Sequence, residues 1–335
     1  MKILIASDFH LDDNPLNEYR WSIFPWLYEQ IDKYEIEHVF ILGDLTEKKD
    51  GHDAKLVNRL VDGLMMLTKL ANVDIVSGNH DSVDRMKPYF MFLNYLLDLT
   101  YHYEPSIFEV EKEKWLILPY SDNPVEEWKK FGSFEGHDKL FIHQDIVGAK
   151  TSNYYKMEKG LDRNCFRKAR QVFSGHIHVP QEIGNIVYVG APYPVDFGDD
   201  YEGRILIVDG DKVTQLKYES IQKIMLDIYS MDELRKVKVR EDDQVKVRLH
   251  LRRVDIPDVE RYKTQIRDWC VLNEVVLCSL ELVLMVDGKV DDGVGDQKIF
   301  KQLNDKEVVK EFAERELLDN NYVDIGMEIV NERGV

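Results

Sequence analysis

The sequence predicts an α/β layered fold, and three observations support this prediction. Between Met1 and about Asp209, short apolar runs alternate with stretches of helical periodicity, which is typical of strands covered on both faces. Polar residues follow directly after several of the apolar runs, and layered α/β folds build their sites at such strand ends. After about Asp209 the pattern becomes that of a small β-α-β unit. We therefore expect a large domain followed by a smaller α+β domain.

The expected strands of the large domain are short apolar runs. They cover residues 2–6, 39–42, 73–76, 107–110, 115–118, 140–142, 171–173, 186–189 and 204–208. Helices are expected between them, over residues 18–34, 54–70 and 86–97. The helix over 86–97 is apolar on more than one face, which fits burial against a second chain and also fits an ordinary core.

Four segments are expected along the chain. Residues 1–215 form the large domain and residues 216–286 the smaller one, with strands over 244–251 and 274–285 and a helix over 257–270. Residues 287–303 are rich in Gly and Asp and are expected to be a linker. Residues 304–335 are expected to form a C-terminal helical segment with one apolar stripe, which can bind a partner or pack on the smaller domain.

Composition indicates a globular chain in a reducing compartment. Of the 335 residues, 44% are hydrophobic and 32% charged, as in soluble proteins. The three cysteines are an odd number without metal-type spacing, so a disulfide framework is not expected. The apolar start at Met1 ends in a charge and predicts a buried strand, and no run is long enough to cross a membrane. The expected location is the cytoplasm.

The formal net charge of −18 restricts the kind of substrate. Either the substrate is not a polyanion, or divalent ions neutralise the carboxylates and a partner supplies positive surface. The strongest basic concentration lies in the smaller domain and is a solvated face or a surface for a DNA backbone. Its candidate DNA-binding residues are Arg235, Lys236, Lys238, Arg240, Arg252 and Arg253.

Five short segments, each directly after an expected strand, carry metal-type ligands. They contain Asp8 and His10, Asp44, Asn79 and His80, His143, and His176 and His178. Carboxylates, imidazoles and one amide without a thiolate favour manganese, iron or zinc over calcium. Two ions held roughly 3.5–4 Å apart, as in known two-metal sites, can polarise a phosphoryl oxygen and activate a water for in-line attack. The chemistry that fits is phosphoester hydrolysis.

In this order the motifs resemble those of the calcineurin-like metallophosphoesterase superfamily. The resemblance implies a layered metallophosphoesterase fold, with two sheets flanked by helices, and a site for two divalent ions. It assigns Asp8, His10, Asp44 and His178 to one ion, and Asp44, Asn79, His143 and His176 to the other. Asp44 is then the bridge. His80 is the acid that protonates the leaving oxygen.

Within that superfamily, residues 115–120, 175–181 and 188–198 resemble segments of the SbcD-type nuclease subunits, and the compact C-terminus resembles phage-encoded versions. This resemblance implies a manganese-dependent nuclease, with 3′-5′ exonuclease activity on duplex ends and endonuclease activity on single strands. It also implies a capping domain, a homodimer, and DNA repair or recombination together with an SbcC-like coiled-coil ATPase. For a phage-encoded chain the location is the host cytoplasm. The alternative is a small-molecule or protein phosphoesterase of the same fold.

The residues that follow Asp44 depart from two related groups. Leu45-Thr46-Glu47-Lys48-Lys49 replaces the Arg-containing loop of protein serine/threonine phosphatases, which disfavours that activity. Glu47 stands where the nuclease relatives usually have His or Asp. Its carboxylate is a candidate catalytic group that hydrogen-bonds His80 and raises the pKa of that imidazole. A solvated loop glutamate is the alternative.

Overall fold

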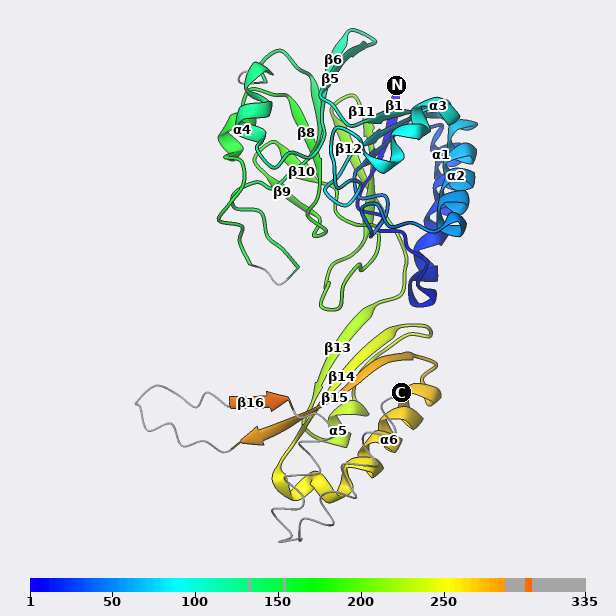
Figure 1. Cartoon of the computed structure of the whole chain (residues 1–335), viewed down its shortest axis with the longest axis vertical. Coiled ribbons are helices and arrows are strands. Elements are labelled where there is room, and N and C mark those ends of the chain that lie inside the picture. Colours follow the sequence, from blue (N-terminus) through cyan, green and yellow to red (C-terminus); the bar gives the residue numbers. More distant parts are fainter. Residues whose placement is uncertain (132–133, 153–154, 287–298, 303–335) are drawn as a thin grey trace, which may run out of the picture. The chain divides into compact units, whose positions relative to one another are not determined.

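The computed structural model describes residues 1–131, 134–152, 155–286 and 299–302 (Figure 1). It divides the chain into two compact units, Met1–Ser220 and Ile221–Val335. Each unit has its own sheet system and its own apolar core.

The first unit contains two six-stranded sheets. The first sheet has the order β12-β11-β1-β2-β3-β4, and the second has the order β5-β6-β7-β8-β10-β9. The strands of the first sheet are β1 (Lys2–Ala6), β2 (His38–Leu42), β3 (Asn72–Val76), β4 (Thr100–His102), β11 (Arg204–Asp209) and β12 (Lys212–Lys217). Those of the second are β5 (Ser106–Val110), β6 (Glu113–Leu118), β7 (Lys139–His143), β8 (Gln171–Gly175), β9 (Gln181–Ile183) and β10 (Ile186–Tyr188). Strands β1 to β4 run parallel, as do β6, β7 and β8.

Alternating side chains divide the apolar residues between two layers. Phe40 and Leu42 of β2 pack with Phe141 of β7 in the core between the sheets. Val39 and Ile41 of β2 belong instead to the core under the helices. This period of two follows from the pleat of a strand, and it explains why runs buried on both faces read as continuous apolar sequence. The observed fold is the expected α/β arrangement of two mixed sheets flanked by helices.

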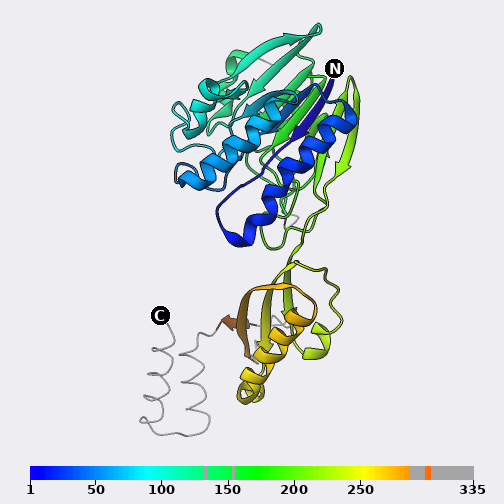
Figure 2. The same ribbon diagram turned by 90° about the vertical axis from the view of Figure 1, so that its right-hand side faces the viewer.

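Helices α1 (Ile23–Tyr34) and α2 (Ala54–Thr68) cover the outer face of the first sheet, as Figure 2 shows. Helix α2 begins where the Asp53 side chain accepts a hydrogen bond from the Leu56 nitrogen, a normal N-cap. Helix α1 ends at Glu35, which adopts a left-handed conformation. The shorter helices are α3 (Leu93–Leu96) and α4 (Pro124–Glu127), together with the 3₁₀ segments Pro15–Ser22, Tyr89–Phe92, Lys129–Phe131 and Arg163–Phe166.

The helix expected over residues 86–97 is wrong as a continuous element. The structure has the 3₁₀ segment Tyr89–Phe92 followed by the single turn α3. Pro88 precedes this segment in an extended conformation, and the ring of a proline disfavours a helical conformation in the residue before it. The apolar residues recur as expected, but within residues 86–97 no helix begins before Tyr89.

The second unit is a four-stranded sheet with the order β13-β14-β15-β16. Its elements are β13 (Lys223–Ile228), α5 (Met231–Leu234), β14 (Gln244–Leu251), the 3₁₀ segment Arg253–Asp258, α6 (Val259–Leu272), β15 (Val276–Val286) and β16 (Ile299–Gln302). Strands β14 and β15 are parallel and joined by α6, which is the expected β-α-β unit. Val247 of β14 packs with Ile266 and Trp269 of α6.

Two boundaries differ in detail from the sequence expectation. Strand β12 runs across the boundary expected between residues 215 and 216. Strand β16 lies within the segment expected to be a linker, residues 287–303, and pairs antiparallel with β15. The expected C-terminal helical segment, residues 304–335, lies outside the described residues.

Candidate metal centre

Strand ends from both sheets bring the expected ligands together. Asp8 follows β1, Asp44 follows β2, Asn79 follows β3, His143 is the last residue of β7, and His176 follows β8. Parallel strands end at the same edge of a sheet, so the two sheets present these residues to one region.

The backbone at this region is locally strained. Four of the expected ligands have a positive φ angle: 56° at Asp8, 44° at His10, 51° at Asp44 and 86° at His176. Non-glycine residues rarely adopt this conformation, and such strain concentrates at functional sites.

Glycines in the motifs let backbone segments approach these ligands closely. A Cβ atom on Gly43 would collide with the His143 ring, and one on Gly78 would collide with Asp44. A Cβ atom on Gly175 would collide with the Leu42 carbonyl oxygen. These three positions therefore require glycine, which explains why Gly accompanies the ligand in three of the motifs.

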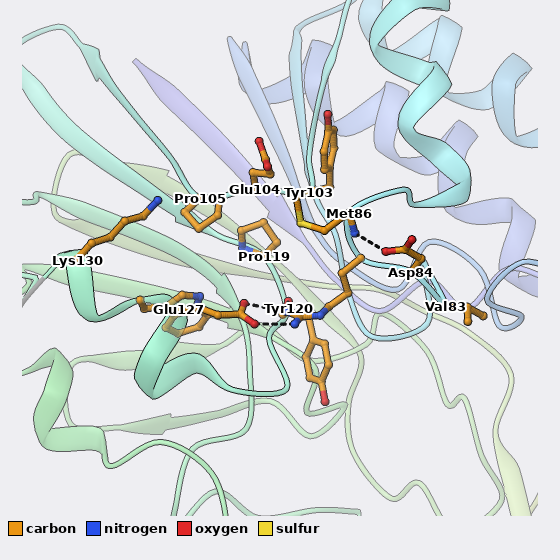
Figure 3. Close-up of a pocket in the computed structure, with 12 residues that line it drawn as sticks. Val83, Asp84, Met86, Tyr103, Glu104, Pro105, Pro119, Tyr120, Glu127 and Lys130 are labelled. Atoms are coloured by element: carbon orange, nitrogen blue, oxygen red, sulfur yellow. Dashed lines mark hydrogen bonds and ion pairs between the residues drawn. The ribbon is translucent and has the colours of Figure 1, made fainter.

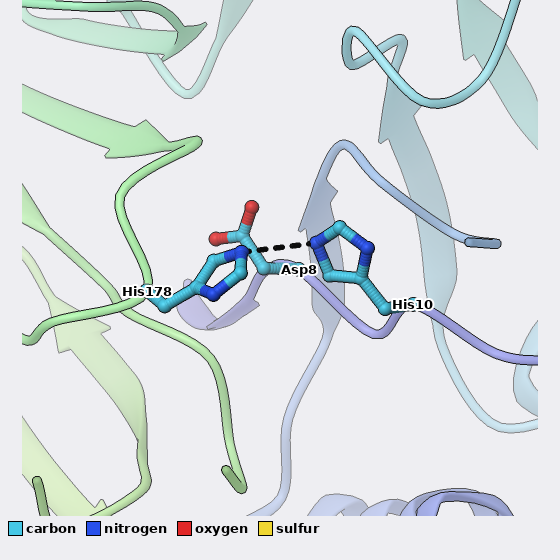
Figure 4. Close-up of side chains that lie close together, drawn as sticks. All are labelled: Asp8, His10 and His178. Carbon is cyan, nitrogen blue, oxygen red and sulfur yellow. Dashed lines mark hydrogen bonds between the residues drawn. The ribbon is translucent and has the colours of Figure 1, made fainter. Parts of the chain in front are cut away.

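Asp8, His10 and His178 form the first group of donor atoms (Figure 4). The Nε2 atoms of His10 and His178 lie 3.1 Å apart. The Nδ1 atom of His10 lies 3.2 Å from Oε2 of Glu47, and Nδ1 of His178 lies 3.9 Å from Oδ2 of Asp199. These carboxylates favour a proton on each Nδ1, which leaves both Nε2 lone pairs directed at one space. In this tautomer the Nε2 atom of each imidazole can bind a metal ion.

Asp44, His143 and His176 form the second group. The Nδ1 atom of His143 lies 2.7 Å from the Leu42 carbonyl oxygen and donates to it, so Nε2 is the nitrogen that can offer a lone pair to a metal ion when it gives up its proton. The Nε2 atom of His176 lies 2.7 Å from Oδ1 of Asp145, which leaves Nδ1. Both remaining nitrogens face Oδ1 of Asn79, at 2.9 Å from His143 and 2.7 Å from His176. The Asn79 oxygen therefore faces two ring nitrogens that are not its hydrogen-bond donors once each ring has its proton on the other nitrogen. The three atoms converge as the ligands of one metal ion would.

Asp44 lies between the two groups. Its Oδ2 atom is 3.4 Å from Nε2 of His10 and 3.5 Å from Nε2 of His143. Burial raises the pKa of Asp44, but the charge and hydrogen bond of His143 outweigh burial and hold that pKa well below its ordinary value. The carboxylate is therefore ionised at neutral pH. Its position is that of a bridge between two cations.

Asp81 fixes the loops that carry Asp44 and Asn79, a role that the sequence did not predict. Its carboxylate accepts hydrogen bonds from the backbone nitrogens of Asp44 at 2.9 Å, Leu45 at 2.8 Å and Gly78 at 2.7 Å. Burial, together with the charge of Asp44, raises the pKa of Asp81 to about 6. The signal was present, since Asp81 ends the Gly-Asn-His-Asp motif.

Arg20 joins three segments around His10 and was also missed. Its guanidinium donates to the His10 carbonyl oxygen and, at 2.9 Å, to the Val195 carbonyl oxygen. It also lies 3.6 Å from Oε2 of Glu47. Arg20 and Val195 are far apart in the sequence, so no local pattern could reveal this contact. The same holds for Asp145 and Asp199.

His80 lies beside the two groups in the orientation expected of an acid. Its backbone nitrogen donates to Oδ1 of Asp44 at 2.9 Å, and its Nδ1 lies 2.8 Å from the Glu47 carbonyl oxygen. That carbonyl can only accept, so Nδ1 carries a proton, and Nε2 is the nitrogen that can give a second proton to a substrate when the ring is doubly protonated. His80 also forms a third group of donor atoms with His10 and Asp44, so a ligand role and an acid role both fit this geometry.

The expected contact between the Glu47 carboxylate and His80 is not what the structure has. The carboxylate lies against His10 and Arg20, and only the main-chain carbonyl of Glu47 contacts His80. The hydrogen bond from His10 lowers the pKa of Glu47 to about 2, against the opposing effect of burial. The Glu47 carboxylate therefore orients a proposed metal ligand, and it is neither freely solvated nor a partner of the His80 ring.

The expected DNA-binding residues all belong to the second unit. Arg235, Lys236, Lys238, Arg240 and Arg252 are exposed, and Arg253 is in a 3₁₀ segment. Three of them have acidic neighbours three residues away in sequence: Arg235 with Asp232 at 3.2 Å, Arg240 with Asp243 at 3.7 Å, and Arg252 with Asp255 at 3.0 Å. These pairs reduce the positive charge of the surface. Their role in DNA binding stays a prediction.

The residues fit a pair of divalent ions. Imidazole nitrogens aimed at each other, a buried ionised carboxylate and glycine cradles around them are the arrangement that bound cations require. Two bound ions would supply electrophilic stabilisation of a phosphoryl group and activation of water. Around them the chain orients each imidazole through its second nitrogen, and His80 lies beside Asp44 with its Nδ1 bound to the Glu47 carbonyl oxygen.

A model of the calcineurin-like phosphoesterase superfamily domain matches residues 1–211. The chain belongs to this superfamily. The expected membership is thus confirmed, and the protein is a phosphoester hydrolase of a family that uses two metal ions. No helix among the described residues is long and apolar enough to span a membrane.

Several solved structures of metallophosphoesterases are similar at low sequence identity. An archaeal phosphodiesterase is 18% identical, with 65% of this chain and 99% of that chain covered and a TM-score of 0.35. A dimetal phosphatase from Danio rerio is 12% identical with the same coverage and a TM-score of 0.38. The nuclease MPE from Pseudomonas putida is 14% identical, with 64% of this chain and 87% of that chain covered and a TM-score of 0.31.

Proposed function

We propose that this metallophosphoesterase is a manganese-dependent phosphodiesterase that cleaves DNA. The observation that carries the proposal is a pair of donor groups in which Asp44 contacts a histidine of each, with His80 beside them. Two ions placed in this way stabilise both the attacking and the leaving oxygen of an in-line displacement. A protonated imidazole next to them serves a poor leaving group such as a deoxyribose hydroxyl.

The resemblance to SbcD-type subunits supports DNA as the substrate. The matching segments flank the site, since Pro119 and Tyr120 follow β6 and Pro180 follows His178. A small β-α-β unit follows the phosphoesterase domain, as a capping domain does in those proteins. On this proposal the protein is a cytoplasmic homodimer that processes DNA ends with an SbcC-like ATPase in repair or recombination.

The test compares two substrates under the same conditions. Manganese-dependent release of nucleotides from linear duplex DNA is measured beside hydrolysis of bis(p-nitrophenyl) phosphate. Cleavage of both, with loss of both in Asp44→Asn, is the expected result. Hydrolysis of the small diester without cleavage of duplex or single-stranded DNA would overturn the proposal for DNA.

A small-molecule or protein phosphoesterase is the second candidate. The net charge of −18 and the acidic neighbours of Arg235, Arg240 and Arg252 favour it, because both weaken attraction to a polyanion. The salt dependence of catalysis separates the two candidates. A nuclease loses kcat/KM steeply as salt increases, whereas an enzyme for small esters does not.

The proposed ATPase partner is tested by truncation. A cut after Met285 would remove β16, which pairs with β15, so a cut after Gln302 is the better design. The shortened chain is expected to keep basal hydrolysis and lose copurification with the ATPase. Retention of ATPase binding at full affinity would contradict a role for residues 303–335 in docking.

A further inference from the structure

A cavity of about 640 Å³ lies next to the second group of donor atoms (Figure 3). It is formed by the loop after the Gly-Asn-His-Asp motif, the loop between β4 and β5, the Pro119–Tyr120 segment and the α4 region. Tyr120 connects it to the site, because the Tyr120 ring lies 5.7 Å from the His176 ring and 6.2 Å from the His143 ring, measured between centroids. A group attached to a phosphate at the metal centre can therefore reach it.

The chemistry of the walls selects a flat, uncharged group. Met86, Tyr103, Pro105 and Pro119 give apolar surface (Figure 3). The charged lining consists of Asp84, Glu104 and Glu127 against Arg85 and Lys130, which is one negative charge in excess. A second phosphate is disfavoured there, whereas an aromatic ring is not.

Arg85 and Glu127 provide a rigid planar surface inside this cavity. The guanidinium forms two parallel contacts with the Glu127 carboxylate, at 2.9 and 2.7 Å, and a third hydrogen bond of 3.1 Å to the Tyr120 carbonyl oxygen. A guanidinium held flat by a carboxylate stacks well on an aromatic ring. Arg85 thus offers its face while its donors are occupied.

We propose that this cavity binds the nucleobase next to the scissile phosphate, stacked on the Arg85–Glu127 pair. This inference rests on the proposed phosphodiesterase function and adds to it a preference for substrates in which a base is unpaired and free to enter. The cavity volume of about 640 Å³ lies within the usual range for small-molecule sites and leaves room for a nucleobase. Cleavage of unpaired strands follows, because a base within a duplex is not available for stacking on protein.

The test uses two diesters that release the same product. Thymidine 5′-(p-nitrophenyl) phosphate carries a base, and methyl p-nitrophenyl phosphate does not. The wild type is expected to prefer the thymidine diester. In Arg85→Ala the ratio of the two kcat/KM values is expected to fall by about 5- to 150-fold, the loss of one base stack. Arg59→Ala is the matched control, since Arg59 forms a similar bidentate pair with Glu18 outside the cavity.

The outcomes separate the cavity from the function. An unchanged ratio in Arg85→Ala, with both diesters affected equally, would show that Arg85 only anchors the loop and would overturn the inference. If the wild type hydrolysed neither diester, the proposed function would fail instead. Fluorescence quenching of 2-aminopurine deoxyriboside 5′-monophosphate then tests base binding in the cavity independently of hydrolysis. Quenching in the wild type that is weakened in Arg85→Ala supports base stacking, and binding without quenching in the wild type contradicts it.

Discussion

The first unit contains two buried clusters of histidine and carboxylate, and they differ in whether ring nitrogens remain without an internal hydrogen-bond partner of the right kind. At the metal centre, Asp44 lies between His10 and His143. In the core between the sheets, Asp74 of β3 lies between His38 of β2 and His102 of β4. The immediate settings of Asp44 and Asp74 are alike, with two imidazoles around one carboxylate in each.

The second cluster is closed by internal hydrogen bonds. The Nε2 atoms of His38 and His102 each bond one oxygen of Asp74, the latter at 2.5 Å. The Nδ1 atom of His102 lies 2.8 Å from Oγ of Ser106, and the His38 ring stacks on Phe40. None of the three cluster residues is among the positive-φ residues of the described chain. The cluster is a satisfied polar network in a core.

The metal centre differs because its outer nitrogens are the occupied ones. Glu47, Asp145 and the Leu42 carbonyl use one nitrogen of a ring, and the other nitrogen faces a shared space. Contact between histidine and carboxylate is therefore no mark of a metal site. The mark is a set of unshared donor atoms that converge, held by a second layer of hydrogen bonds.

The largest expected effect comes from Asp44→Asn. The substitution removes the charge between the two donor groups, so we expect weak binding of both ions and no detectable hydrolysis. Asp74→Asn is the matched control, because it makes the same exchange between two imidazoles and should keep kcat per folded molecule. Two ions bound by Asp44→Asn with unchanged affinity in a manganese titration would exclude the bridging role.

His80→Ala is expected to have the next largest effect. Loss of the proton donor should lower kcat by about 10²–10⁴-fold, while both ions remain bound. Manganese stoichiometry and kcat are measured on the same preparation. Loss of one ion in this variant would make His80 a ligand, as its proximity to His10 and Asp44 allows.

Glu47→Gln is expected to weaken binding of one ion about 10- to 100-fold, the usual cost of losing a carboxylate behind a histidine ligand. The reason is that the Glu47 carboxylate lies against His10 and not against His80. Manganese affinity is the readout. Unchanged affinity with a shifted alkaline limb of the pH–rate profile would contradict this assignment.

Asp74→Asn should act on stability and leave chemistry intact. Burial raises the pKa of Asp74, but hydrogen bonds from His102 and His38 outweigh burial and lower it. A lowered pKa in the folded state gives stability that is present above the unfolded pKa and lost as pH falls through the folded one. We expect a loss of about 1.5–3 kcal/mol of unfolding free energy near neutral pH, from hydrogen bonds to a charged group. The difference from wild type should shrink in acid, as denaturant unfolding at several pH values will show.

Sequence reasoning reached the parts of the site that local patterns carry. Ligands placed directly after apolar strands were found because each motif is short and contains its own glycine. It could not reach Arg20 or Asp199, whose contacts join residues far apart along the chain. It also gave Glu47 the wrong partner, since the sequence cannot say toward which histidine a loop carboxylate turns.

The fold shows the same division. Each of the nine strands expected in the large domain has its counterpart, and most of them are apolar throughout because they are buried on both faces. The edge strands β4, β9 and β12 were missed, since β4 and β9 have only three residues each and β12 has no buried residue. The break before Tyr89 was missed because apolar periodicity continues through it.

Manganese titration followed by electron paramagnetic resonance tests the central claim most directly. The account predicts that each chain binds two ions close enough for their spins to couple, and that hydrolysis of bis(p-nitrophenyl) phosphate rises with the second. Full activity with a single bound ion per chain, or two ions without coupling, would contradict a centre bridged by Asp44.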